Sequence, residues 1–252
     1  MIVATTTLSV HTRAFHSLVL KKVVMAITGL CLIGFLLMHM FGNLKVFIGP
    51  DAYNHYADWL KGELNDNVGG ILEPLLPHGW FIWIFRIFMV ACLVLHVYCA
   101  LKVWRASVHG RGATQGKKYT RVHRPERTIA VRFMRWGGVT LLLLLILHLL
   151  MFTTKSVRFG AFESSARPFD MFTASFSSST WYIFVIYVVF MAAVGLHVRH
   201  GFYSAFTTLG ANVSERAREV LNGLAYFVAT LVFVGFLLPP VASVLGFING
   251  GN

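Results

Sequence analysis

Long apolar stretches separated by polar segments dominate the chain. Five of them have the roughly 20 mostly apolar residues that an α-helix needs to cross the hydrocarbon core of a bilayer. They cover residues 23–47, 80–104, 136–153, 181–206 and 221–245, with Trp, Tyr or Phe near their ends, as in interfacial belts. Runs such as Leu141–Leu145 do not alternate as barrel strands do. The pattern predicts an all-α integral membrane protein with five transmembrane helices in a single membrane domain, residues 1–252.

Composition agrees with this pattern. Of the 252 residues, 56% are hydrophobic and 13% are charged, whereas a soluble domain has roughly 25% charged residues. A soluble enzyme, a nucleic-acid binder and a disordered tail are therefore excluded. Residues 1–20 contain no compact apolar core followed by a small-residue cleavage site, so no removable signal peptide is predicted. The three cysteines, Cys31, Cys92 and Cys99, lie inside apolar stretches, which argues against a disulfide framework.

The net charge of +12 comes from basic loops on one side of the predicted spans. That side, which includes the N-terminal arm and the loop between the second and third spans, carries 15 Lys and Arg residues against 5 on the other side. The positive-inside rule then predicts a multi-pass protein of the plasma membrane with a cytoplasmic N-terminus and an outer C-terminus. The basic loop either sets this topology alone or also docks a cytoplasmic partner.

Four of the 11 histidines fall inside the first four spans, one in each: His39, His96, His148 and His197. Ionisable residues inside a membrane span are costly and are usually functional. Each histidine lies past the midpoint of its span, and successive spans run in opposite directions. His39 and His148 are therefore expected in the outer half of the bilayer and His96 and His197 in the inner half, with about 10–15 Å between the two levels.

Two facing imidazoles at each level are what a bis-histidine haem iron needs. We therefore expect a four-helix haem-binding bundle, with the fifth helix peripheral, that holds two haems b. Three other interpretations stay open. The histidines form hydrogen bonds between helices, they relay protons in a haem-free transporter, or they bind an iron–sulfur centre of Rieske type together with the cysteines.

Further polar residues near the spans are candidates for binding haem propionates or a quinone. Propionates need cationic or hydroxyl partners near each membrane surface. Lys45 is a candidate at the outer level, and Arg199 and His200 are candidates at the inner level. A quinone site needs proton donors and acceptors beside an aromatic slot. The candidates for such a site are Glu73, His78, Trp80 and Arg86, although their segment also fits an ordinary interfacial turn.

The segments around the four histidines, taken in order, resemble the cytochrome b membrane-anchor subunit of succinate dehydrogenase and fumarate reductase, in its five-helix, two-haem form. Met38-His-Met-Phe-Gly-Asn-Leu-Lys45 resembles the first-helix motif. Leu-His96-Val-Tyr and Ile-Leu-His148-Leu resemble the second and third, and Gly195-Leu-His-Val-Arg-His-Gly-Phe-Tyr-Ser204 the fourth. The similarity covers nearly all of residues 20–245. Pro77-His-Gly-Trp-Phe-Ile-Trp83 resembles the actinobacterial branch.

The resemblance implies that His96 and His197 hold the proximal haem, and that His39 and His148 hold the distal haem. It also implies a flavoprotein subunit and an iron–sulfur subunit on the cytoplasmic face, with menaquinone as the membrane partner. The chain would then serve the respiratory chain and the tricarboxylic acid cycle as a subunit that lacks the catalytic flavin. A small extra membrane subunit is compatible with this assembly. Another class of cytochrome b, such as the anchor of a hydrogenase or a formate dehydrogenase, is a further alternative.

Overall fold

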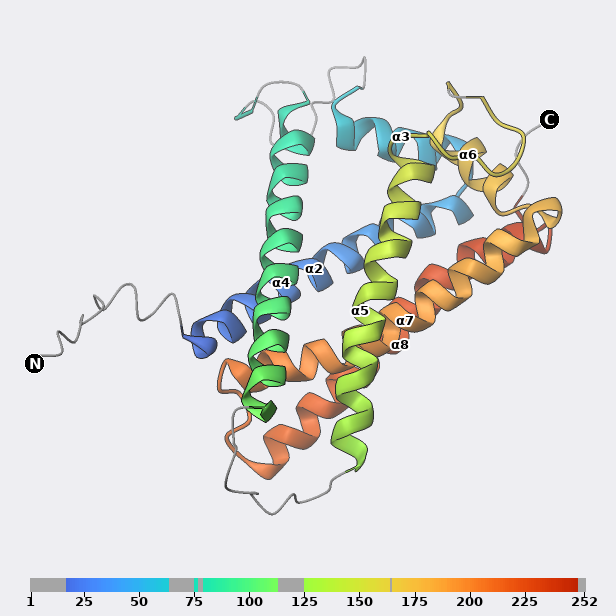
Figure 1. The fold of residues 1–252 in the computed structure, drawn as a ribbon. Coiled ribbons are helices and arrows are strands. Elements are labelled where there is room, and N and C mark those ends of the chain that lie inside the picture. The colour runs from blue at the N-terminus through green and yellow to red at the C-terminus, as the bar shows by residue number, and fades with distance from the viewer. Residues whose placement is uncertain (1–16, 64–74, 77–78, 113–124, 164, 249–252) are drawn as a thin grey trace, which may run out of the picture.

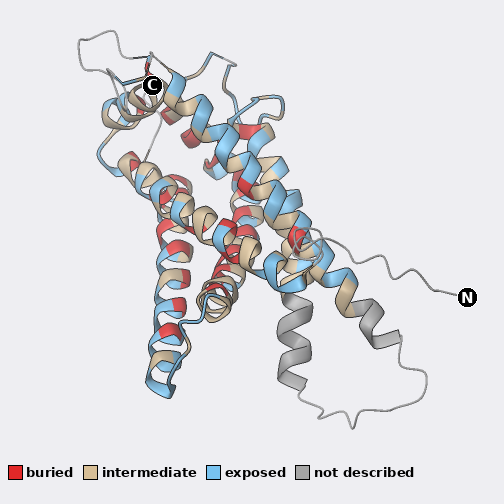
Figure 2. Ribbon diagram, turned by 90° about the vertical axis from the view of Figure 1, so that its left-hand side faces the viewer, coloured by how far each residue is buried: buried red, intermediate tan, exposed pale blue. Residues whose placement is uncertain are grey.

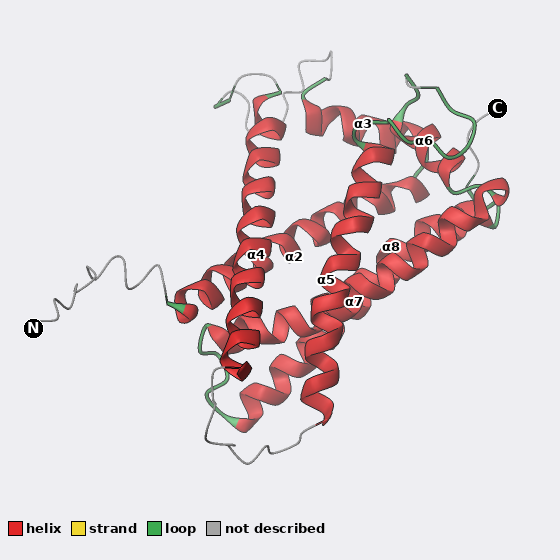
Figure 3. Ribbon diagram, viewed as in Figure 1, coloured by secondary structure: helices red, strands yellow, loops and turns green. Residues whose placement is uncertain are grey.

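Helices form all the regular structure in the part of the chain that the computed structural model describes, which is residues 17–63, 75–76, 79–112, 125–163 and 165–248 (Figure 3). Five helices are long and apolar enough to cross a membrane. They are α2 (Leu18–Leu44), α4 (Trp80–Gly112), α5 (Pro125–Phe152), α7 (Trp181–Thr208) and α8 (Glu215–Val244). The predicted all-α fold with five spans is confirmed.

Local capping explains why several helices begin outside the predicted spans. Ser17 caps α2 by accepting a hydrogen bond from the Val19 amide, and Ser214 caps α8 by accepting one from the Ala217 amide. Proline occupies the first position of α5, where its missing N–H has no intrahelical partner to lose. The charged residues that precede the predicted apolar span therefore form the first turn of α8.

Two shorter helices, which the hydropathy pattern did not predict, lie together at one end of the bundle (Figure 1). One is α3 (Pro50–Lys61), which follows the 3₁₀ turn η1 (Lys45–Phe47); the other is α6 (Pro168–Ser175), which precedes the 3₁₀ turn η2 (Ser178–Thr180). Proline at the start of α3 and left-handed Gly62 (φ 70°) at its end are ordinary helix boundary signals. Helix α3 is too short and too polar to be predicted as a membrane span.

The long helices run in alternating directions, so their ends gather at two opposite ends of the molecule (Figure 1). Contacts between α2 and α4 illustrate this, because Phe35 packs on Phe85 whereas the later His96 contacts the earlier Met25. The end with α3 and α6 carries Asp51, Asp58, Glu63, Glu163 and Asp170, whereas Glu126, Glu215 and Glu219 lie toward the opposite end. The opposite end carries the described basic residues Lys21, Lys22, Lys102, Arg105, Arg135, Arg216 and Arg218.

The fifth span, α8, packs with one face on the bundle and presents its other face outward. Helix α8 lies antiparallel along α7 and also packs against α2, and Figure 2 shows buried residues concentrated in these helices. The most apolar window of α8 is 39% buried, against 11% for α4 and 6% for α5. Small residues explain the difference, because Ala225, Ala229 and Gly235 let neighbouring helices approach closely.

Candidate functional site

The four membrane histidines meet in two pairs, each formed by side chains from two different helices. His39 on α2 lies beside His148 on α5, with ring centroids 5.9 Å apart and ring planes at 83°. His96 on α4 lies beside His197 on α7, with centroids 6.3 Å apart and planes at 62°. We call these the outer pair and the inner pair. The outer pair lies toward the end that carries α3 and α6.

Aromatic side chains surround the outer pair. Phe35 stacks on His39 one helical turn away, with ring centroids 5.3 Å apart and planes at 14°. Phe236 of α8 contacts the same imidazole at 5.6 Å, and Phe152 lies 5.3 Å from His148. Helix α8 therefore contributes to this site although it supplies no histidine. These rings form an apolar wall against which a flat aromatic ligand can pack.

A tyrosine provides the polar contact of the outer pair. The Nδ1 atom of His148 lies 3.0 Å from the Tyr187 hydroxyl, and that hydroxyl lies 3.7 Å from the Met151 sulfur, to which it donates. Tyr187 is 6% exposed and Met151 is 1% exposed. Tyr187 was not predicted from the sequence, because a tyrosine inside an apolar helix carries no signal of its own.

Hydrogen bonds also connect the backbone of His39 to α3. The Asn43 side-chain amide donates to the His39 carbonyl at 3.0 Å, and the Tyr53 hydroxyl donates to the Asn43 side-chain oxygen at 3.2 Å. Burial raises the pKa of Tyr53 from its ordinary 10.0 to about 12. The hydroxyl therefore stays protonated and remains a donor across the physiological range.

The inner pair has a main-chain partner instead. The Nδ1 atom of His96 lies 3.1 Å from the Met25 carbonyl oxygen and 3.3 Å from the Thr28 hydroxyl, which itself donates to main-chain carbonyls of α2. A carbonyl only accepts, so Nδ1 of His96 carries the hydrogen, and Nε2 of the neutral ring keeps its lone pair. A hydrogen bond from the ring nitrogen that does not bind the metal is what orients histidines that ligate metals.

Small residues leave room beside the inner pair. A Cβ atom on Gly29 would lie 3.1 Å from Cε1 of His96, which is tighter than ordinary van der Waals contact. One on Gly138 would lie 3.9 Å from Cε1 of His197. The Nδ1 atom of His197 is buried and has no hydrogen-bond partner among the described residues. A buried polar atom without a partner is costly, so the position of this ring is one that hydrogen bonding alone does not explain.

Both pairs fit a bis-histidine haem by the separation of their rings. Two imidazoles that each bind one metal ion at about 2 Å have ring centroids about 6 Å apart. The observed separations are 5.9 and 6.3 Å. Among the described residues, no three His, Cys, Asp or Glu side chains come together as a metal site. A bis-histidine haem takes only two protein ligands per iron, so pairs are what this group requires.

The residues predicted to hold propionates have other partners in the structure. The Lys45 ammonium lies over the rings of Phe41 and Tyr56, 5.1 Å from each centroid. The Arg199 guanidinium faces α8, where it donates to the Tyr226 hydroxyl at 2.8 Å and to the Asn222 side-chain oxygen at 3.3 Å. His200 is half-buried on α7. Roles for these three residues at propionates stay predictions.

The predicted quinone residues are only partly located. Glu73 and His78 lie outside the described residues. Trp80 is the first residue of α4 and is 58% exposed. Arg86 lies on an exposed face of α4, with its guanidinium 5.0 Å from the centroid of Trp83. Two of the four residues thus belong to one exposed helical surface, and a quinone site there stays a prediction.

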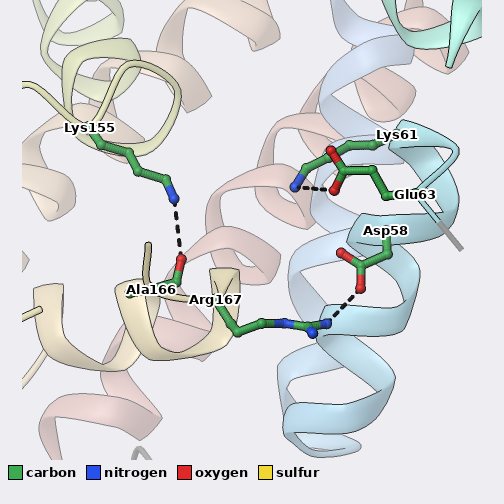
Figure 4. A network of polar contacts seen from close by, with 6 residues as sticks. All are labelled: Asp58, Lys61, Glu63, Lys155, Ala166 and Arg167. Atoms are coloured by element: carbon green, nitrogen blue, oxygen red, sulfur yellow. Dashed lines mark hydrogen bonds and ion pairs between the residues drawn. The ribbon is translucent and has the colours of Figure 1, made fainter. Parts of the chain in front are cut away.

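The end of the molecule beside the outer pair is held by polar contacts between α3 and α6. Arg167 and Asp58 form an ion pair at 2.6 Å, drawn in Figure 4 with the neighbouring Lys61–Glu63 pair. The buried Asn54 side chain accepts a hydrogen bond from the Phe169 amide at 3.1 Å. Five residues at this end line a shallow hollow: Asp51, Asn54, His55, Asp58 and Arg167.

Cys31, Cys92 and Cys99 are free, and the latter two are buried, in agreement with the expectation that they form no disulfide framework.

Together the described residues provide two imidazole pairs at two levels, one with a tyrosine beside it and one with a main-chain carbonyl. Comparison of the chain with protein-family models, with curated proteins and with solved structures finds no match.

Proposed function

We propose that this protein is a membrane cytochrome b that holds two haems, one between His39 and His148 and one between His96 and His197. The observation that carries the proposal is the pairing itself. Four histidines that are far apart in the sequence, each on a different helix, form two close pairs at separations suited to a shared iron. A bound haem supplies one-electron redox chemistry at each level.

The chain's own residues support this role at both levels. The Met25 carbonyl holds His96 with Nε2 free for the metal, and the Tyr187 hydroxyl contacts the corresponding Nδ1 of His148. Aromatic rings of Phe35, Phe152 and Phe236 exclude water from the outer pair. Two centres at different depths connect the two faces of the bundle, as electron transfer across a membrane requires.

At a finer level, we propose that the chain is the membrane anchor of a succinate:menaquinone oxidoreductase or fumarate reductase. This step rests on the sequence resemblance around the four histidines. The excess of Lys and Arg at the end opposite α3 and α6 also favours it, because this basic end would face the cytoplasm and dock the iron–sulfur and flavoprotein subunits. Electrons would pass between that iron–sulfur subunit and menaquinone in the plasma membrane.

Reduced-minus-oxidised spectra of the purified protein test the haem proposal. We expect two cytochrome b signals in the native chain. His39→Ala and His148→Ala should each remove one signal, and His96→Ala and His197→Ala should each remove the other. His55→Ala, which changes an exposed histidine on α3, is the control and should keep both.

Two outcomes of these spectra would contradict the haem proposal or its ligands. A native protein that binds no haem would replace this proposal with the haem-free proton-relay alternative, whereas four variants that all keep both signals would overturn the assignment of these histidines as the ligands. Co-purification of a flavoprotein and an iron–sulfur protein, with succinate-dependent reduction of the haems, tests the finer proposal separately. Reduction by another donor complex would favour a different cytochrome b class.

A further inference from the structure

The outer and inner pairs differ in the group that contacts the non-ligating nitrogen of one histidine. Nδ1 of His96 lies 3.1 Å from the main-chain carbonyl of Met25 and 3.3 Å from the Thr28 hydroxyl, which itself donates to main-chain carbonyls. Among the described residues, Nδ1 of His148 meets only the side-chain hydroxyl of Tyr187, at 3.0 Å. A main-chain acceptor cannot be removed by substituting a side chain, but a hydroxyl can. The difference therefore gives experimental access to one centre at a time.

The direction of the hydrogen bond follows from what His148 has to do. If Nε2 of the neutral imidazole gives its lone pair to a metal, the single ring hydrogen resides on Nδ1. Nδ1 then donates and the Tyr187 oxygen accepts. The Tyr187 hydrogen remains available for the Met151 sulfur at 3.7 Å. In this relay of hydrogen bonds the imidazole donates to the hydroxyl and the hydroxyl donates to the thioether, so each of these polar groups has a suitable partner.

Packing holds the relay in place. Tyr187 is nearly fully buried, and its ring lies 4.9 Å from Phe176 in an edge-to-face contact and 5.8 Å from Phe190. Met151 is more deeply buried still. In this apolar setting the hydroxyl has few alternative partners, so its contact with His148 is strongly favoured.

We infer that Tyr187 is a positioning residue that sets the redox potential of the outer centre through His148. This inference rests on the haem proposal above. An acceptor on Nδ1–H increases the electron donation of the imidazole to the metal and thereby favours the oxidised, more positively charged state. Loss of the hydroxyl should raise the midpoint potential of the outer centre and leave the inner centre unchanged.

The test is a redox titration of the purified haem-loaded protein, followed by visible spectroscopy. His148→Ala first identifies which of the two transitions belongs to the outer pair. In Tyr187→Phe, which removes only the hydroxyl, we expect the ratio of reduced to oxidised outer centre at a fixed potential to rise roughly tenfold. A tenfold ratio corresponds to about 59 mV for a one-electron couple.

Two further variants make the result decisive. Tyr182→Phe removes a hydroxyl from the same helix at a position where the ring contacts Phe159 and Trp181, and it should leave both midpoints unchanged. Met151→Leu keeps the tyrosine but removes the sulfur, and should shift the outer midpoint by a smaller amount. This variant carries the test if Tyr187→Phe does not assemble.

The possible failures can be told apart. Two haems with an unchanged outer midpoint in both Tyr187→Phe and Met151→Leu, or equal shifts of both centres, would overturn the inference while leaving the haem proposal intact. A native protein without haem would overturn the haem proposal, and the inference with it.

Discussion

At the scale of single residues, the second partner of each histidine determines what the imidazole can do. The Met25 carbonyl places the hydrogen of His96 on Nδ1 and leaves Nε2 as the free nitrogen. Such a bond restricts both the tautomer and the rotation of the ring. The glycines beside His96 also matter, because they leave the imidazole the room that this orientation needs.

We predict that Gly29→Leu disturbs the inner pair. Because a Cβ atom there already comes within 3.1 Å of His96, the larger side chain has to displace the imidazole. Overpacking of this kind costs about 1–3 kcal/mol. Thermal unfolding in detergent should show a lower Tm, and the spectral signal lost in His96→Ala should weaken.

Gly34→Leu is the matched control for that substitution. It changes a glycine on the same helix whose Cβ would have no neighbour within 4 Å. This variant should keep both the Tm and the two spectral signals. Equal behaviour of the two variants would show that the contact between Gly29 and His96 is unimportant.

We also predict a pH dependence that belongs to Tyr53. Burial raises its pKa from 10.0 to about 12, so the folded state retains the hydroxyl proton more strongly than the unfolded chain. The resulting stabilisation is complete below pH 10 and is lost as the pH rises through 12. The Tm of the native chain should fall more steeply across this window than that of Tyr53→Phe.

An absorbance titration of the phenolate checks the same prediction independently. In the native protein Tyr53 should ionise about two pH units later than an ordinary tyrosine, so Tyr53→Phe should reduce the absorbance change of the late ionisation. A native titration without a late step that depends on Tyr53 would contradict the assignment.

At the scale of elements, close approach between helices decides where α8 lies. A Cβ atom on Gly235 would overlap the side chain of Met40 on α2, which is itself 8% exposed. The contact brings α8 to the outer pair, where Phe236 packs on His39. Helix α8 is thus a wall of the candidate site, although its sequence contains no residue with metal chemistry in the span.

We predict that Gly235→Val destabilises the bundle by about 1–3 kcal/mol, because the larger side chain forces α8 away from α2. Gly223→Val is the control, since it lies on an exposed part of the same helix with no neighbour near its Cβ position. Circular dichroism melts in detergent measure both. A Gly235→Val melt that matches the control would argue against a tight contact between α2 and α8.

Prediction from the sequence was uneven among the elements. The five spans were predicted because length and hydropathy are properties of contiguous residues, and they agree with the structure. The two helices α3 and α6 were missed because they are short and one of them is polar. The sequence does not indicate that α8 packs against α2, since the small residues at this contact are common throughout membrane helices.

At the scale of the whole molecule, the charged residues divide between two ends while the four histidines lie between them. This division predicts the orientation in the membrane, with the basic end in the cytoplasm. Two exposed positions at opposite ends suit a test: Val213, in the turn between α7 and α8, is 86% exposed, and Phe247, after α8, is 81% exposed.

We predict that a membrane-impermeant maleimide labels Phe247→Cys in intact cells but labels Val213→Cys only after the membrane is permeabilised. The native chain is the control for labelling of its own three cysteines, two of which are buried. The opposite labelling pattern would reverse the proposed orientation, and with it the face on which the redox partners dock.

By itself, the sequence determined the five long apolar helices and their order, and it predicted the depth of each histidine, because these follow from apolar length and from the rise per residue. Only the tertiary structure decided which imidazoles meet a carbonyl or a hydroxyl and how α8 reaches the outer pair. The physical reason is rotation. A helix that is apolar on nearly every side has no polar face to indicate which residues point inward, so packing against its neighbours makes that choice.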